Sequence, residues 1–298
     1  MNIHALRIFT KVASMKSVTK AAEALSISQP AVTVQIRNLE KETGLRLVET
    51  EGRGIKLTRE GEFLVARAER LFDMEKDMEN KLIQLKNGEL QDLRISSTYL
   101  PANFLLPIWL AKFKNDFPSI KVNLYSGNSD QVIEKLLHYK SDIAFVVKEE
   151  WNHPDIKRHH LMDIDFWFLV PHGHKYDGKE VSLRELMSEP FLFREEGSST
   201  RDILFSLCKI HRVPVPNIGL QFHGLNESIR SVMAGYGTML APALAVKDHL
   251  KRKEVGRVIV KGIEIRRPIY LCSRKGDEEL STNLNHFIEF VKNSSITE

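Results

Sequence analysis

Side chains that can contact nucleic-acid bases and phosphates are concentrated in residues 1–58 of this 298-residue chain. Gln29 carries an amide that can make two hydrogen bonds to adenine, and Pro30 and Val34 offer apolar surface to a thymine methyl group. Cations and hydroxyls can instead hold a protein on the phosphate backbone. The candidates of this second kind are Lys20, Ser28, Thr33, Arg37 and Arg53; Thr33 can also contact a base, and Arg53 can also enter the minor groove. The set predicts contact with double-stranded DNA, and the alternative for each residue is an ordinary solvated surface position.

Three helices must position these side chains. Apolar residues at helical spacing between Ile3 and Ala13 predict a first helix, and residues 17–25 predict a second. A third helix begins near Ser28 and ends at Gly44, because proline is tolerated in a first turn and glycine commonly terminates a helix. Two helices joined by a tight turn, the second of them amphipathic, form a helix–turn–helix.

A short hairpin follows these helices. Residues 45–48 and 55–57 predict its strands, and Glu51-Gly52-Arg53-Gly54 predicts a glycine-rich tip, as in the wing of a winged helix. Residues 1–58 hold nine Lys and Arg against five Asp and Glu, whereas the whole chain has a net charge of +4. The positive surplus therefore lies almost wholly in this small module, which suits contact with a polyanion.

A long helix without proline is predicted over residues 58–86. Its apolar residues recur every seven positions, the spacing at which helices pair: Leu64, Leu71, Met78 and Leu85. Glu75 interrupts a second line of apolar positions. We expect a homodimer through residues 58–86, in which two DNA modules read a dyad-symmetric operator. The alternative is a helix that packs only within its own chain.

Strands and helices alternate beyond residue 88, which predicts an α/β fold with a mainly parallel sheet. Strands are expected at 93–95, 121–125, 143–147, 166–170, 191–193 and 268–272, and helices at 103–116, 131–138, 200–211, 227–234 and 281–292.

Hydroxyl and amide side chains stand just before or at the start of several of these helices. Hydroxyls and free amides at helix N-termini favour anions, so a small anionic ligand is expected in this part of the chain. The candidate effector-binding residues are Thr98, Ser199, Thr200 and Asn226, with His223 and Arg194 as further polar candidates. The alternative is that the hydroxyls only cap their helices.

The sequence offers little support for an enzyme. It has no His-Glu-x-x-His, Gly-x-Ser-x-Gly or phosphate-binding glycine loop, and its paired histidines lack zinc-ligand spacing. We therefore expect no catalytic residue, no metal and no cofactor. Cys208 and Cys272 are expected to be reduced structural thiols. No apolar run approaches the roughly 20 residues that span a membrane, and the first residues do not resemble a signal peptide, which predicts a cytoplasmic protein.

Residues 9–58 resemble the N-terminal module of LysR-type transcriptional regulators. The resemblance is carried by Ser17-Val18-Thr19-Lys20-Ala21-Ala22, Ser28-Gln29-Pro30-Ala31-Val32-Thr33, Ile36-Arg37-Asn38-Leu39-Glu40 and Leu57-Thr58-Arg59-Glu60-Gly61. It continues into the C-terminal part through Leu105-Leu106-Pro107, residues 194–201, Asn226-Glu227-Ser228-Ile229 and Ala234-Gly235-Tyr236-Gly237. Family members usually carry an aromatic residue and an arginine where this chain has Val48 and Thr50, so Arg53 would be the main cation of the wing.

The resemblance implies an α+β multidomain protein with three parts. These are a winged helix–turn–helix at 1–58, a linker and dimerisation helix at 59–89, and a two-lobed α/β effector domain like periplasmic binding proteins at 90–298. Lobe I would comprise 90–162 and 268–298, and lobe II 163–267. It further implies a transcriptional regulator that forms a homotetramer, whose packing responds to a ligand between the lobes and alters DNA bending or contact with RNA polymerase. Two alternative hypotheses are a secreted solute-binding protein, which fits only residues 90–298, and an architectural DNA binder with an inert C-terminal domain.

Overall fold

The computed structural model describes residues 1–52, 54–86, 92–148, 151–277 and 282–295. The chain divides into two compact units, residues 1–90 and 91–298, and each is described by itself. Arg53, the expected cation of the wing, lies outside the described residues. No helix within the described ranges is long and apolar enough to cross a membrane.

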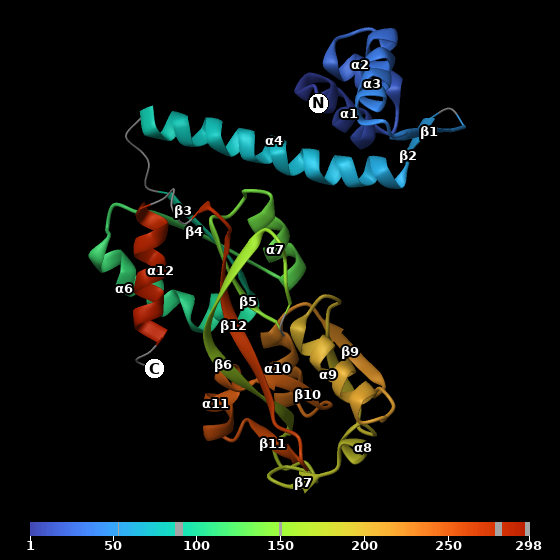
Figure 1. Ribbon diagram of the computed structural model, residues 1–298. Coiled ribbons are helices and arrows are strands. Elements are labelled where there is room, and N and C mark those ends of the chain that lie inside the picture. The colour runs from blue at the N-terminus through green and yellow to red at the C-terminus, as the bar shows by residue number, and fades with distance from the viewer. Residues whose placement is uncertain (53, 87–91, 149–150, 278–281, 296–298) are drawn as a thin grey trace. The chain divides into compact units, whose positions relative to one another are not determined.

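The first unit contains three short helices, α1 (Ile3–Met15), α2 (Val18–Leu25) and α3 (Gln29–Thr43), as Figure 1 shows. Each begins at a side chain that accepts hydrogen bonds from first-turn amides: Asn2, Ser17 and Ser28. Such caps satisfy amides that have no acceptor within the helix. α3 ends at Gly44, whose φ of 69° is in the left-handed region that glycine adopts without strain.

The wing and the long helix complete this unit. β1 (Val48–Glu51) pairs antiparallel with β2 (Gly54–Leu57), and α4 extends over Arg59–Lys86. Thr58 joins them, because its hydroxyl donates to the Arg46 carbonyl at 2.7 Å and accepts from the Gly61 amide at 3.0 Å. A Cβ on Gly61 would lie 2.1 Å from the Leu47 carbonyl oxygen, so only glycine fits at this contact.

The second unit is built on a twisted eight-stranded sheet with the order β4-β3-β5-β12-β6-β11-β7, and β10 also pairs with β6. Lobe I holds β3 (Asp92–Thr98), β4 (Lys121–Gly127) and β5 (Ile143–Val147), with α5 (Tyr99–Phe104), α6 (Leu106–Asp116), α7 (Ser129–Leu137) and α12 (Thr282–Ser295). Its core is aromatic: Phe287 packs edge-on against Phe113 and Phe145, with ring centroids 5.0 and 6.2 Å apart.

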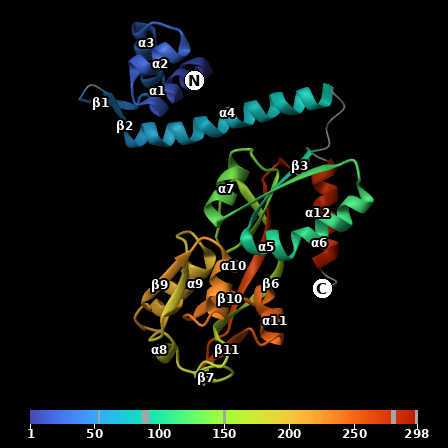
Figure 2. The same ribbon diagram turned by 180° about the vertical axis from the view of Figure 1, so that it is seen from behind.

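Lobe II contains the parallel pair β8 (Phe191–Arg194) and β9 (Ile218–Phe222). Its other elements are β7 (Glu180–Val181), β10 (Met239–Pro242), β11 (Val255–Val260), α8 (Leu183–Leu186), α9 (Ser199–Ile210), α10 (Leu225–Met233) and α11 (Ala243–Lys251). Two long strands, β6 (Ile156–Pro171) and β12 (Ile265–Arg274), pair antiparallel and run through both lobes, as both views of the ribbon show (Figures 1 and 2).

These crossover strands make the sheet mixed, where a mainly parallel one was expected. β3 pairs parallel with β4 and β5, but β12 runs antiparallel to both β5 and β6. The expected helix over 103–116 is also divided: it begins earlier, at Tyr99, and is interrupted at Leu105, with proline in the first turn of α6. A proline there cannot continue the α5 ladder, which explains the break.

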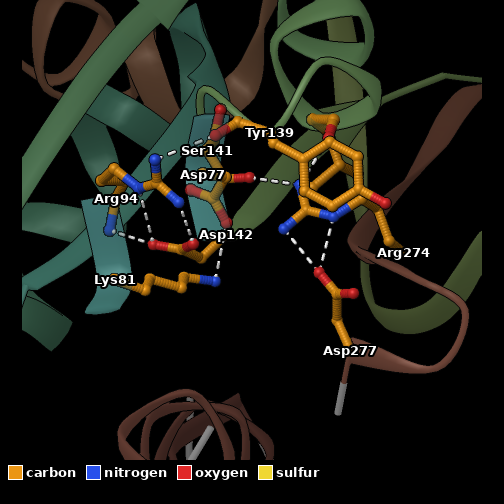
Figure 3. A network of polar contacts seen from close by, with 9 residues as sticks. Asp77, Lys81, Arg94, Tyr139, Ser141, Asp142, Arg274 and Asp277 are labelled. Carbon is orange, nitrogen blue, oxygen red and sulfur yellow. Dashed lines mark hydrogen bonds and ion pairs between the residues drawn. The ribbon is translucent and has the colours of Figure 1, made fainter. Parts of the chain in front are cut away.

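A polar cluster fixes the end of lobe I where β3 begins (Figure 3). The Arg94 guanidinium donates to both carboxylate oxygens of Asp142, at 3.1 and 2.6 Å, and to the Tyr139 carbonyl. Arg274, at the end of β12, is paired with Asp277 and lies over the Tyr139 ring. Such two-pronged pairs hold geometry firmly, so the starts of β3 and β5 and the end of β12 are tied together.

Candidate functional site

The first turns of α3 present a polar face to solvent. Gln29 and Pro30 are exposed, Val34 is 51% exposed, and Arg37 lies on the same side of the helix. The Gln29 side-chain oxygen accepts a weak hydrogen bond from Thr19 of α2, at 3.4 Å. The structure therefore leaves the candidate amide near the start of α3 and accessible to a ligand.

The remaining predicted DNA contacts surround this face. Ser28 caps α3, Thr33 is half-buried and donates to the Gln29 carbonyl at 3.1 Å, and Lys20 is exposed on α2. The opposite side of α3 is buried through Val32, Ile36 and Leu39. Burying those three large aliphatic side chains, at about 2 kcal/mol each, fixes which face of α3 meets solvent.

The described part of the wing is acidic. Glu49 and Glu51 are exposed on β1, and Glu49 lies opposite Lys56, the cation of β2. Thr50 is exposed, whereas Val48 packs against both apolar clusters of the module. The apolar residue at position 48 thus serves the core, and the hydroxyl at position 50 leaves β1 without a cation.

The long helix α4 has two different halves. Leu64 and Ala68 pack against the three-helix module, so the predicted seam is satisfied within the chain at these positions. Further along, apolar side chains are exposed on the helix: Leu71, Met74, Met78, Leu82, Ile83 and Leu85. Glu75 forms an ion pair with Arg7 of α1, which explains why a carboxylate interrupts the apolar pattern.

An interlobe cavity of about 40 Å³ lies where α7, α9 and α10 begin. Thr98 and Thr200, both predicted from the sequence, line it. Ser199 is the first residue of α9, and its side chain is outside the described part; Asn226 is exposed in the first turn of α10 and is not among the lining residues. The cavity therefore brings one predicted hydroxyl from each lobe together.

The hydroxyls of the cavity differ in their bonding. Thr98 does not cap α5: its hydroxyl donates to the Phe145 carbonyl at 3.4 Å and accepts from the Val147 amide at 3.3 Å. Ser198, which begins α9, makes no side-chain cap bond. Ser198 and Thr200 are 7% and 8% exposed, and neither hydroxyl has a hydrogen-bond partner within the described residues. These two hydroxyls are available to a ligand.

Arg194 is the cation of the cavity. Its Nε and Nη2 donate to the two carboxylate oxygens of Glu195, at 2.9 and 3.0 Å, and Nη2 also donates to the His223 carbonyl at 2.8 Å. The guanidinium carbon lies 5.5 Å from the Tyr99 ring centroid of lobe I. Both lobes are therefore in contact beside the cavity.

A second cavity, of about 200 Å³, adjoins the first, since Ser129 and Val147 line both. Lys148 and Asp202 line it from lobe I and lobe II. Desolvation raises the pKa of Asp202; Lys148 opposes this shift and Asp130 reinforces it. The region thus resists additional negative charge at Asp202.

Sequence reasoning named Arg194 only as a further candidate and missed Tyr99, Asn128, Glu195 and Ser198, which also line the interlobe cavity. The neighbouring polar pair Arg194-Glu195, directly after a buried strand, was the available signal. Over the described ranges, no group of His, Cys, Asp or Glu is arranged to hold a metal ion.

A helix–turn–helix with a polar exposed face, joined to a two-lobed domain with an internal cavity, defines a protein with a DNA-reading module and a ligand-binding domain. Residues 3–62 match the family model described as "Bacterial regulatory helix-turn-helix protein, lysR family", and residues 86–295 match "LysR substrate binding domain". The chain belongs to the LysR family of DNA-binding transcriptional regulators, which are not enzymes.

Three similar proteins illustrate the relationship. The "RuBisCO operon transcriptional regulator" of Allochromatium vinosum is 30% identical over 293 residues, which is 98% of this chain and 95% of the relative. Full-length CbnR, crystallised with the target DNA, has a TM-score of 0.55 at 24% identity and covers 99% of this chain and 100% of its own. The regulatory domain of CcmR from Synechocystis PCC6803, in complex with 2-PG, has a TM-score of 0.64 at 21% identity and covers 69% of this chain and 98% of its own. The two structures establish the fold.

Proposed function

We propose that this regulator binds a dyad-symmetric operator as a dimer formed through α4. The exposed polar face of α3, at Gln29, Pro30, Thr33, Val34 and Arg37, carries this proposal. Gln29 and Val34 read base edges, while Ser28, Lys20 and Arg37, with Arg53 of the wing, contact phosphates. The CbnR structure with DNA supports the assignment by the likeness of its fold.

The exposed apolar side chains in the second half of α4 support the dimer, since a helix that packed only within its chain would not leave Met78, Leu82 and Leu85 more than half exposed. Two such dimers form a homotetramer in the cytoplasm. A small anionic metabolite bound in the interlobe cavity, at Thr98, Ser199 and Thr200 with Asn226 nearby, changes the packing of the effector domains. The angle between the DNA modules then changes, and with it promoter bending or contact with RNA polymerase.

Footprinting on the DNA upstream of the gene that encodes this protein tests the proposed operator binding. We expect a protected region symmetric about its centre, and a protected region without that symmetry would contradict the dimeric reader. Arg37→Ala should weaken operator binding. It should also make the binding constant depend less steeply on salt concentration, by the amount that one phosphate contact contributes. Lys41→Ala removes the same charge from the last turn of α3 and serves as the matched control.

The response to ligands distinguishes the proposed regulator from the alternative, an architectural DNA binder with an inert effector domain. A screen of small anions by thermal shift should find compounds that stabilise the protein, because a ligand that binds only the folded state raises its apparent stability. Those compounds should change the length of the footprint. A footprint that no stabilising compound alters would favour an inert effector domain.

A further inference from the structure

The charged side chains that line the interlobe cavity are, among the residues the structure describes, one cation and one anion. Arg194 and Glu195 form a two-pronged pair, and their side chains are 8% and 17% exposed. The carboxylate neutralises the guanidinium where the ligand would bind, so the pair contributes donors to the cavity without net charge. A ligand therefore meets no uncompensated formal charge from these residues.

Four helices of nine or more residues begin at the cavity: α7, α9, α10 and α11. The N-terminus of a helix carries a partial positive charge of roughly half an elementary charge. Three of these helices also carry an acidic residue in the first turn, namely Asp130, Asp202 and Glu227, and α11 carries none. The carboxylates offset part of the positive potential that the helices supply.

The two hydroxyls without partners indicate that a ligand belongs in this cavity. Ser198 and Thr200 are more than nine-tenths buried as residues, and both line the cavity, where their hydroxyls can bond to a group that enters it. An acceptor oxygen of a ligand would satisfy them. Hydroxyls donate to an anion without adding charge, so the site has good hydrogen-bonding capacity for oxyanions and a modest positive potential.

We infer that the cavity selects a small ligand with one negative charge over a ligand of the same shape with two, and that Glu195 sets this preference. The inference rests on the proposed function, in which this cavity is the effector site. A single charge is stabilised by the helix N-termini and the two hydroxyls. A second charge would lie beside Glu195, and among the described residues that line the cavity the cation, Arg194, is already paired with that carboxylate.

The test compares tetrahedral anions of similar shape and different charge on the full chain. Methanesulfonate carries one charge and sulfate carries two, and acetate provides a planar single charge. Thermal shifts at constant ionic strength give apparent dissociation constants for each anion. We expect methanesulfonate or acetate to bind at least roughly tenfold more tightly than sulfate, given the strength of charge repulsion at a partly buried site.

Glu195→Gln keeps an acceptor for Arg194 but removes the negative charge, and should improve sulfate binding at least roughly tenfold. Glu196→Gln is the matched control: it removes the same charge from the next residue, whose side chain is 88% exposed, and should leave every anion affinity unchanged. Circular dichroism confirms that both variants are folded.

The inference fails if sulfate binds the unaltered protein as tightly as methanesulfonate. It also fails if the two glutamine variants behave alike, or if none of the three anions binds. A symmetric operator footprint obtained with the same preparation would show that such a failure concerns the ligand preference and not the proposed DNA-binding function.

Discussion

The Tyr99 ring of lobe I lies 5.5 Å from the guanidinium carbon of Arg194 in lobe II, and that guanidinium also donates hydrogen bonds to Glu195 and to the His223 carbonyl. A cation over an aromatic ring contributes about 0.5–2 kcal/mol when the cation is desolvated. The contact therefore favours the closed arrangement of the lobes around the cavity.

Removing the ring should open the cavity. Tyr99→Ala is expected to lower the unfolding free energy of the second unit by about 1 kcal/mol and to weaken anion binding, because the closed state loses this contact. Tyr99→Phe retains a ring and should behave as the unaltered protein. Thermal melts with and without methanesulfonate measure both quantities, and equal behaviour of the two variants would show that the ring contact is without effect.

A substitution at Gly61 tests how much the close packing at the junction between the wing and α4 contributes to stability. Gly61→Ala places a methyl group 2.1 Å from the Leu47 carbonyl oxygen, so we expect the first unit to lose about 2 kcal/mol of stability through overpacking. Scanning calorimetry should show a lower transition for that unit alone. Glu62→Ala, at an exposed neighbouring position, is the control and should shift the transition little.

The wing offers a gain-of-function prediction. Thr50 is exposed on β1 between Glu49 and Glu51, so Thr50→Arg adds a cation to an acidic strand. One new phosphate contact should strengthen operator binding several-fold and steepen the salt dependence by about 0.9 in slope. Thr50→Gln has similar length without charge and should leave the slope unaltered; an unchanged slope with arginine would mean that this strand does not approach the DNA.

The buried thiols make a prediction about pH. Burial raises the pKa of the Cys272 thiol to about 12 and also raises that of Cys208. At pH 8 the Cys272 thiolate fraction is then about one in ten thousand, so the folded protein should resist alkylation there. Mass spectrometry after iodoacetamide treatment should find Cys272 unmodified in the folded protein and modified in urea.

The raised pKa of Cys272 also makes the stability of the fold depend on pH. The unfolded chain has the lower thiol pKa, so it loses its proton first, and the stability of the fold should decline as pH rises from about 9 to 12. Cys272→Ala should reduce this decline. An identical decline in both proteins would assign it to other groups.

Elements with a strong local signal were predictable from the sequence. Every residue of β5 is apolar and buried, and the predicted strand over 143–147 agrees with the structure. The first half of β6 was not predicted, because its residues 157–160 are charged or histidine and show no apolar alternation. That half is a strand because β12, about a hundred residues later in the chain, hydrogen-bonds to it. A prediction from neighbouring residues alone cannot detect a partner strand so far along the chain.

The candidate site also has a part that could be predicted from the sequence and a part that could not. Thr98 and Thr200 could be suspected because each stands beside a helix start, and both line one cavity. The role of Glu195 depends on the side-chain conformation that turns both of its oxygens toward Arg194. The sequence places the two residues side by side, but Glu195 follows the end of β8, so the direction of its side chain could not be anticipated.

The long pairing of β6 with β12, from Ile156 opposite Arg274 to Phe166 opposite Ile265 with one register shift between Ile269 and Tyr270, limits how this domain can be rearranged. Lobe II is one stretch of chain, lobe I is made of the two stretches that flank it, and both junctions between the lobes fall inside hydrogen-bonded strands. Lobe II can therefore be exchanged between relatives as a single insert only if both of its ends keep their place in the β6–β12 pairing. A hybrid needs two junctions in matching register, since a slip of one residue in either strand would turn its buried side chains outward.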